Sequence, residues 1–225
     1  MTDLIKTRIN FACVLDHDTV AATRLYEQVC ENVTTPFDFY TYCGAHDEVD
    51  ANKLPSEIKV QRLQYDRIIP GSWDPLKLFS NDIGIHIGQP VVYLGHNLTI
   101  IDNIDEIVNA PCAPTEMLYF TSYEKPTIPL MKWNHGYQTY RYLNFKFNVL
   151  QMRQKYQTNV NAYMLHESTS PLTDWYSFVP GEQIKSANDI IQMQELRIVL
   201  DADPKHVHKL TKEIIRANTK TTIEK

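Results

Sequence analysis

Short apolar segments alternate with an amphipathic segment over the first hundred residues, and this alternation restricts the chain to few folds. Ile9–Leu15 is an apolar run, and Phe37–Cys43 alternates apolar and polar side chains as a strand does. Between them, Val20–Cys30 carries apolar residues at helical spacing. Two further strand-like segments follow, at Ile58–Leu63 and Pro90–Leu94. Strands linked by helices predict an α/β fold with an open, mostly parallel sheet and flanking helices.

The composition is that of an ordinary globular protein. The 225 residues are 43% hydrophobic and 22% charged, so we expect a single domain over 1–225. The formal net charge of −5 argues against a general phosphate-binding surface, although it leaves room for a local basic groove. The N-terminus lacks a secretory signal, and no segment approaches the roughly 20 apolar residues that span a bilayer. We therefore expect a soluble, cytoplasmic protein with no membrane partner.

The cysteines indicate a reducing compartment. Cys13, Cys30, Cys43 and Cys112 are widely spaced and form no Cys-x-x-Cys pair. This spacing favours reduced, mostly buried thiols over a disulfide framework or a zinc site.

Ligands of open α/β sheets bind at the carboxyl ends of the strands, so two loops are the first places to look for a site. Asp16–Thr19 follows the first predicted strand and Gly95–Asn97 follows the fourth. Asp and Thr before a helix are also ordinary capping residues, so the first loop has a structural explanation as well as a functional one. Asp102–Glu106 favours a helix start, because acidic side chains are stabilised near the positive end of the helix dipole. We assign neither Asp105 nor Glu106 to catalysis.

Several segments, in the expected order over nearly the whole chain, resemble one enzyme family. Val91–Ile107 resembles a metal-site strand that runs Tyr-Leu-Asp-Leu-Asp and continues to Asn-Ile-Asp-Glu-Leu. Gly71–Phe79 resembles a Gly-Trp-Trp-Asn-Lys-Leu-x-Leu-Phe segment. The remaining likenesses lie at 11–15 with the helix around Arg24, at 147–152, and at 179–186. Together they resemble small, stand-alone glycosyltransferases of the nucleotide-sugar-binding GT-A type, as found in phages and bacteria.

The resemblance implies transfer of a sugar from a nucleoside-diphosphate sugar, with a UDP-sugar favoured, to an acceptor hydroxyl. It implies a nucleotide-binding half over 1–110 and an acceptor-side half over 111–225. The implied nucleotide-binding residues are Ala12, Cys13, Val14, Asp16, Arg67, Trp73, Gly95, His96, Asn97, Lys205 and His206. The candidate general bases are Glu167, Asp201 and Asp203. Because related enzymes occur in phages, a hydroxymethylated DNA base in the host cytoplasm is a conceivable acceptor.

The chain departs from the family at the residues that bind metal. Gly95 and Asn97 stand where the family has two aspartates, and Asp201-Ala202 stands where it has a His-Gly pair. Hard Mg²⁺ and Mn²⁺ prefer carboxylate oxygen, which neither Gly95 nor Asn97 supplies. We therefore expect no cofactor and no metal ligands of the family type, although Mn²⁺ or Mg²⁺ could bind through other groups.

Two alternatives follow from these losses. In the first, cationic side chains replace the metal and neutralise the departing diphosphate. The candidate cations are Arg67, Lys77, Lys205, His206, His208 and Lys209. Taken alone, the last four are better explained by a solvated helix face after Pro204, whereas their position beside the family-like site favours the functional interpretation. In the second alternative, the chain is an inactive GT-A-fold pseudoenzyme that acts as a binding module or partner subunit.

One aromatic stretch is open to two interpretations. Trp133–Tyr142 interleaves aromatic and polar side chains. Such a stretch can stack on a sugar or a base, or it can belong to a strand and the core.

Overall fold

The structure is a computed structural model, and it describes residues 8–15, 19–44, 49–63, 73–119, 129–157, 160–166, 179–180 and 198–200. The helices of this part of the chain are α1 (Thr19–Asn32), α2 (Asp74–Lys77), α3 (Asp105–Val108), α4 (Thr139–Phe147), α5 (Val149–Tyr156), α6 (Val160–His166) and the short 3-10 helix η1 (Ala51–Lys53). The strands are β1 (Ile9–Leu15), β2 (Phe37–Cys43), β3 (Ile58–Arg62), β4 (Pro90–Leu94), β5 (Leu98–Ile100), β6 (Met117–Tyr119), β7 (Leu130–Asn134), β8 (Val179–Pro180) and β9 (Ile198–Leu200).

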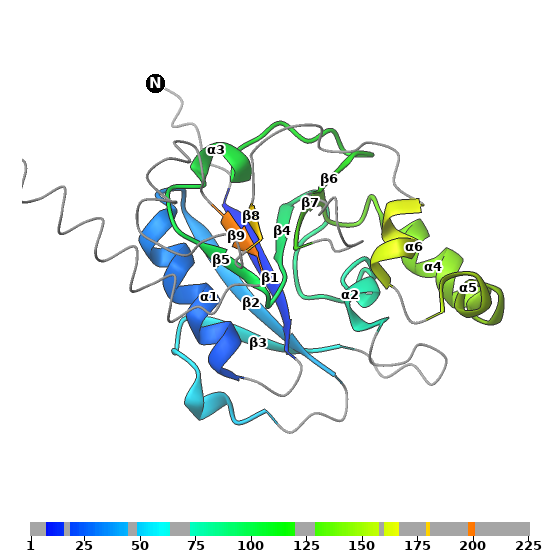
Figure 1. Cartoon of the computed structure of the whole chain (residues 1–225), viewed down its shortest axis with the longest axis horizontal. Helices are drawn as coiled ribbons and strands as arrows, with labels where there is room; N and C mark the ends of the chain where they lie inside the picture. The colour runs from blue at the N-terminus through cyan, green and yellow to red at the C-terminus, as the bar shows by residue number, and fades with distance from the viewer. Residues whose placement is uncertain are drawn as a thin grey trace, which may run out of the picture.

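Six strands form the main sheet, in the order β3-β2-β1-β4-β7-β6. The first four strands of the chain run parallel, and β7 runs antiparallel to both of its neighbours. Figure 1 shows the sheet open and twisted between helices. The predicted α/β fold with an open, mostly parallel sheet is confirmed, and so are its first four strands.

A second, three-stranded sheet has the order β5-β9-β8. Its central strand pairs antiparallel with β5, and Leu200 lies opposite Leu98. This pairing joins segments about a hundred residues apart in the sequence. Leu200, the last residue of β9, therefore lies beside Leu98, the first residue after the Gly95–Asn97 loop.

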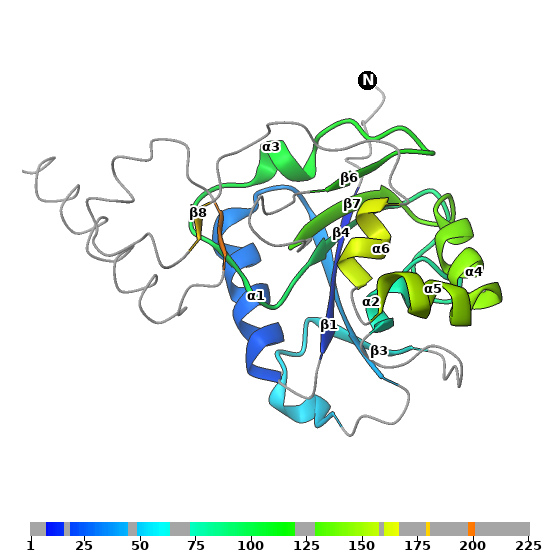
Figure 2. The same cartoon turned by 45° about the vertical axis from the view of Figure 1, so that its right-hand side comes forward.

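Two hydrophobic clusters cover the two faces of the main sheet. Alternate side chains of a strand point to opposite faces, so Phe11 and Cys13 pack toward α1 and α3 while Ala12 packs on the other side. The second face is covered by α2, α4, α5 and α6. Figures 1 and 2 place α1 and the α4–α6 group on opposite sides of the sheet.

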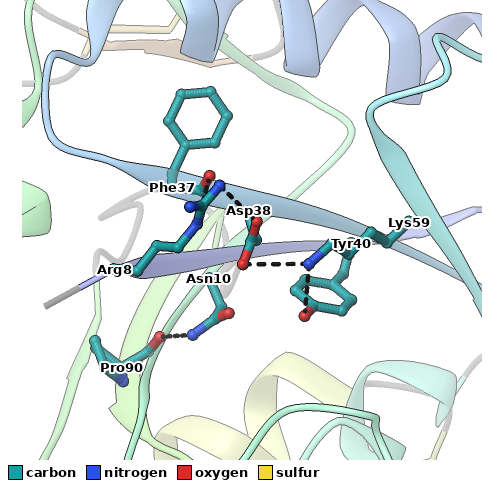
Figure 3. A network of polar contacts seen from close by, with 7 residues as sticks. All are labelled: Arg8, Asn10, Phe37, Asp38, Tyr40, Lys59 and Pro90. Carbon is teal, nitrogen blue, oxygen red and sulfur yellow. Dashed lines mark hydrogen bonds and ion pairs between the residues drawn. The ribbon is translucent and has the colours of Figure 1, made fainter.

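Polar contacts link the amino-terminal ends of the parallel strands (Figure 3). The Asp38 carboxylate lies 2.9 Å from Arg8 Nη2 and 3.2 Å from Lys59 Nζ. Lys59 also lies over the ring of Tyr40, 4.9 Å from its centre. The Asn10 amide donates to the Pro90 carbonyl oxygen at 3.0 Å. These contacts join the start of β1 to β2 and β4, and β2 to β3, at the edge opposite the strand carboxyl ends.

The four cysteines are free thiols, of which Cys13 and Cys43 are buried, Cys112 is half-buried and Cys30 is exposed. The expectation of mostly buried thiols thus holds for two of them fully. Among the described helices, none has the length and apolar character needed to cross a membrane.

Candidate functional site

A cavity of about 220 Å³ lies where β1 ends and α1 begins. It is lined by Cys13, Val14, Leu15, Ala21, Ala22, Leu25 and His96. Small side chains at the start of α1 leave this space, because Ala21 and Ala22 face the strand end with only a methyl group each. The cavity is mostly apolar and lies at the carboxyl end of a parallel strand, which is where ligands of open α/β sheets bind.

The structure brings three of the predicted nucleotide-binding residues to this cavity. Cys13 and Val14 reach it from β1, and His96 reaches it from the loop between β4 and β5. Ala12 does not line it, because its side chain is fully buried on the opposite face of the sheet. The sequence therefore located two strand ends that converge, although they lie about eighty residues apart.

The thiol of Cys13 supplies a neutral, weakly polar wall. Burial raises the pKa of the Cys13 thiol to about 11, although its contact with Thr41 acts in the opposite direction. The Cys13 Sγ and Thr41 Oγ1 atoms are 3.3 Å apart. A neutral thiol beside apolar side chains extends the apolar wall of the cavity and offers no nucleophile at neutral pH.

The loop between β4 and β5 is a tight turn held at both ends. The N–H of Gly95 donates to the Pro129 carbonyl oxygen at 2.7 Å, and the N–H of Leu98 donates to the Gly95 carbonyl oxygen at 3.1 Å. A Cβ atom on Gly95 would lie 3.2 Å from the Pro129 oxygen and 3.1 Å from Asn97 Oδ1. Glycine fits at position 95 because the backbone of Pro129, the residue directly before β7, comes close to it.

In the family that the sequence resembles, two carboxylates at the corresponding positions hold a divalent metal, and the residues of this chain do not fit that ion. Gly95 has no donor atom, and the place of its side chain is crowded by Pro129. Asn97 offers a neutral amide oxygen, which binds hard cations more weakly than a carboxylate does. A family-type metal centre on this loop is thus incompatible with the donor set.

A cation from α1 reaches the same loop. Arg24 Nη2 donates a hydrogen bond to the carbonyl oxygen of His96. His96 lines the cavity, so this guanidinium lies beside a lining residue and beside the residues predicted to meet the diphosphate. Arg24 lies in a segment that carries the family resemblance, but it is not among the residues predicted for the site.

Two other predicted groups have structural roles. Trp73 has no exposed surface and packs against Phe145 at a ring distance of 4.3 Å, so any effect on a nucleotide would act through packing. Lys77 is buried, and its Nζ atom lies 2.6 Å from Asp74 Oδ1. Its charge is thus already matched by a carboxylate.

Asp105 belongs to the scaffold under the loop. Its carboxylate accepts hydrogen bonds from the backbone N–H groups of Thr34 and Thr35, each at about 3.0 Å, and from both hydroxyls. The Asn103 amide also donates to it, at 3.0 Å. Partial burial acts to raise the pKa of Asp105, but the hydrogen bonds from Thr34, Asn103 and Thr35 outweigh it and hold the pKa well below its usual range. The prediction of a helix start here is confirmed by α3.

The remaining predicted residues lie outside the described part of the chain. These are Asp16, Arg67, Glu167, Asp201, Asp203, Lys205 and His206. Asp201 directly follows Leu200, whose pairing with Leu98 is described above.

Comparison with known proteins bears on the fold. No family model and no curated protein matches the sequence. Two solved structures of the galactosyltransferase LgtC are similar to this structure. One is a complex with donor and acceptor sugar analogues, with a TM-score of 0.58, and the other is an active-site mutant, with a TM-score of 0.59. Each shares 9% identity over 92% of this chain and 95% of the LgtC chain. The chain therefore has a GT-A-like fold.

Proposed function

We propose that the chain is a glycosyltransferase that moves a sugar from a nucleoside-diphosphate sugar, with a UDP-sugar favoured, to an acceptor hydroxyl. The observation that carries the proposal is the cavity between Cys13, Ala21 and His96, because it joins the strand end and the loop that the family resemblance assigns to the nucleotide. The LgtC structure with donor and acceptor sugar analogues has the same type of fold, which supports the reaction class.

The size of the cavity suits part of such a donor. Sites that enclose a whole ligand measure roughly 300–1,000 Å³. The cavity here is about 220 Å³, so we assign it to the nucleoside. The diphosphate would then lie along the open side, over Gly95, His96 and Asn97. Under this proposal the chain keeps its division into a nucleotide-binding half, 1–110, and an acceptor-side half, 111–225.

The proposed mechanism neutralises the leaving diphosphate with side chains. The charge that develops on the departing phosphate is stabilised by cations in a site from which water is excluded. Arg24 is the cation that we propose for this role, and its hydrogen bond to the His96 carbonyl oxygen supports the choice. Lys205 and His206 follow β9 by only a few residues, and they remain proposed contributors. Glu167, Asp201 and Asp203 remain the proposed candidates for the base that accepts the proton of the acceptor hydroxyl.

A second candidate is an inactive GT-A-fold protein that binds a nucleotide or serves as a partner subunit. The close approach of Pro129 to Gly95 favours it, because this position has adapted to glycine rather than to an acidic ligand. The two candidates share the cavity and differ in turnover. A hydroxymethylated DNA base is one acceptor to include when turnover is measured.

Thermal unfolding with UDP and UDP-sugars, in the presence of Mn²⁺ or of EDTA, tests the proposal. A ligand at 100 times its Kd stabilises a folded protein by about 2.7 kcal/mol. We expect stabilisation by UDP-sugar that EDTA does not remove, followed by sugar release or transfer detected by mass spectrometry. Stabilisation without release or transfer would select the inactive alternative, and no stabilisation by any nucleotide would refute both nucleotide-binding versions.

A pair of neighbouring variants tests the location. Ala21→Leu fills the cavity, whereas Val20→Leu adds a methylene group at a position on α1 that does not line it. We expect Ala21→Leu to weaken nucleotide binding by about tenfold or more through overpacking, and Val20→Leu to bind as the native chain does.

A further inference from the structure

An exposed apolar face lies on α4 and α5, on the side of the sheet opposite α1 (Figures 1 and 2). Phe147 is 78% exposed and Leu150 is 80% exposed. Tyr137, Tyr140 and Leu143 are also exposed. We call these five residues the α4–α5 face. Tyr140, Leu143 and Phe147 recur at helical spacing, so they share one side of α4, and Leu150 is exposed in the first turn of the next helix, α5.

The charge of the segment that carries this face differs from the charge of the whole chain. Residues 129–166 contain five Lys and Arg and no Asp or Glu, although the chain as a whole has 27 acidic residues. Arg153 and Lys155 of this segment are exposed on α5. Arg153 lies one helical turn after Leu150, so a positive charge directly borders the apolar surface. A partner of this face must therefore offer both apolar area and negative charge.

The combination of apolar and basic side chains selects the class of partner. Nucleic-acid binding relies on many phosphate contacts by Lys and Arg, and this face has few exposed basic residues. A pair of identical faces in a symmetric dimer would bring the same basic groups together. The segment 205–225 is itself basic, with six Lys and Arg against two Glu, so it also lacks the complementary charge. An interfacial helix needs the combination seen here, Phe and Leu beside a small number of basic groups.

We propose that the α4–α5 face docks on the surface of a lipid bilayer that contains anionic headgroups. Phe147 and Leu150 insert at the level of the headgroups and the first acyl carbons, while Arg153 and Lys155 contact lipid phosphates. Tyr137 and Tyr140 flank them with an apolar ring and a polar hydroxyl, which suits the boundary of a bilayer. The sequence predicts no membrane partner because no apolar segment is long enough to span a bilayer. A helix that lies on the bilayer surface does not need such a segment. This proposal does not depend on the proposed function.

Vesicle sedimentation of the full chain tests the proposal. The probes are vesicles of phosphatidylcholine alone and vesicles of an equimolar mixture with phosphatidylglycerol. We expect binding to the anionic vesicles that weakens with salt, and little binding to the neutral ones. The double variant Phe147→Ser/Leu150→Ser should lower the partition coefficient by at least about tenfold, because each side chain contributes its apolar area to the bound state. Arg153→Gln/Lys155→Gln should lower it by roughly tenfold or more, and only on anionic vesicles.

A matched control comes from the other side of the molecule. Val20 on α1 is 72% exposed, so Val20→Ser removes an equally accessible apolar side chain that lies outside the α4–α5 face. This variant should bind vesicles as the native chain does. Since all of these positions are exposed, each variant should keep the thermal unfolding curve of the native chain, and circular dichroism checks this.

Three outcomes would overturn the proposal. The first is an absence of binding to anionic vesicles at low salt, and the second is equal binding by Phe147→Ser/Leu150→Ser and the native chain. The third is evidence that the α4–α5 face binds another partner. A dimer in analytical ultracentrifugation that this variant abolishes would assign it to a second copy. Duplex DNA binding that the variant abolishes, without vesicle binding, would assign it to nucleic acid.

Discussion

Gly95 and Pro129 meet backbone to backbone, with the Gly95 N–H donating to the Pro129 carbonyl oxygen at 2.7 Å. This contact fixes the loop after β4 to the residue directly before β7. It also occupies the space in which a side chain at position 95 would lie, because a Cβ atom there would be 3.2 Å from the same oxygen. The absence of a side chain at position 95 and the close packing of the loop therefore go together.

We predict that Gly95→Asp does not create a metal site and instead destabilises the fold. The added side chain must displace Pro129 or Asn97, which typically costs about 1–3 kcal/mol. Asn97→Asp is the matched control, since it changes an existing side chain without adding bulk. Urea unfolding measures the stability, and nucleotide binding with and without Mn²⁺ measures the metal effect. A Gly95→Asp variant of native stability would contradict the crowding.

Arg24→Ala should weaken the binding of UDP more than the binding of uridine. A charge-assisted hydrogen bond contributes about 1.5–3 kcal/mol, so we expect roughly a ten- to hundredfold loss for UDP. Uridine carries no phosphate and should lose much less. Arg24→Lys keeps the charge and should restore part of the UDP affinity. Calorimetry with both ligands makes the comparison, and equal losses for UDP and uridine would mean that Arg24 only supports the loop.

Asp105→Asn should remove an acid-sensitive contribution to stability. The folded-state pKa of Asp105 is lowered by hydrogen bonds from Thr34, Asn103 and Thr35, although partial burial acts against them. A carboxyl with a lowered folded pKa stabilises the fold above its unfolded pKa of about 3.9, and this stability is lost as the pH falls below that value.

The difference between the native chain and Asp105→Asn should therefore be largest near neutral pH, at about 1–2 kcal/mol, and should shrink toward pH 3. Urea midpoints measured across this range give the difference directly. Glu106→Gln, at the neighbouring exposed position, provides the control for loss of one negative charge. A difference that stays constant with pH would show that the carboxylate is not the source of the effect.

The thiols should react at different rates with a disulfide reagent. Cys30 is exposed, so it should react first in the folded chain. Cys13 is buried, and burial raises the pKa of its thiol to about 11, so it should react only when the chain unfolds. Cys30→Ser should remove the fast phase and leave the slow ones. A fast phase that persists in this variant and disappears in Cys13→Ser would contradict the buried, neutral state of Cys13.

Much of the fold could be predicted because each strand carries its own local signal. Phe37–Cys43 and Pro90–Leu94 have the predicted boundaries, since apolar runs bounded by polar loops mark buried strands without reference to the rest of the chain. The stretch Trp133–Tyr142 was harder to interpret. It divides into the end of β7, with Trp133 fully buried, and the start of α4, with Tyr140 exposed. Aromatic composition alone does not separate core from surface.

The candidate site could be predicted only in part, because its parts are distant in sequence. The loops after β1 and β4 were expected from the position of ligands in parallel sheets. Arg24 was not assigned, since its significance comes from a hydrogen bond to a residue 72 positions away. Lys77 was considered as a free cation, whereas its burial against Asp74 makes it part of the scaffold.

The sequence by itself determined the strand segments, the α/β class and the presence of Gly95 and Asn97, which carry no carboxylate, in the loop after the fourth strand. These follow from local periodicity and residue chemistry. Only the tertiary structure decided that Cys13 and His96 share one cavity, that Gly95 lies against Pro129, and that Phe147 and Leu150 are exposed together. Each of these depends on which distant elements pack side by side, and the physical reason is that burial and contact are properties of the whole arrangement rather than of any segment.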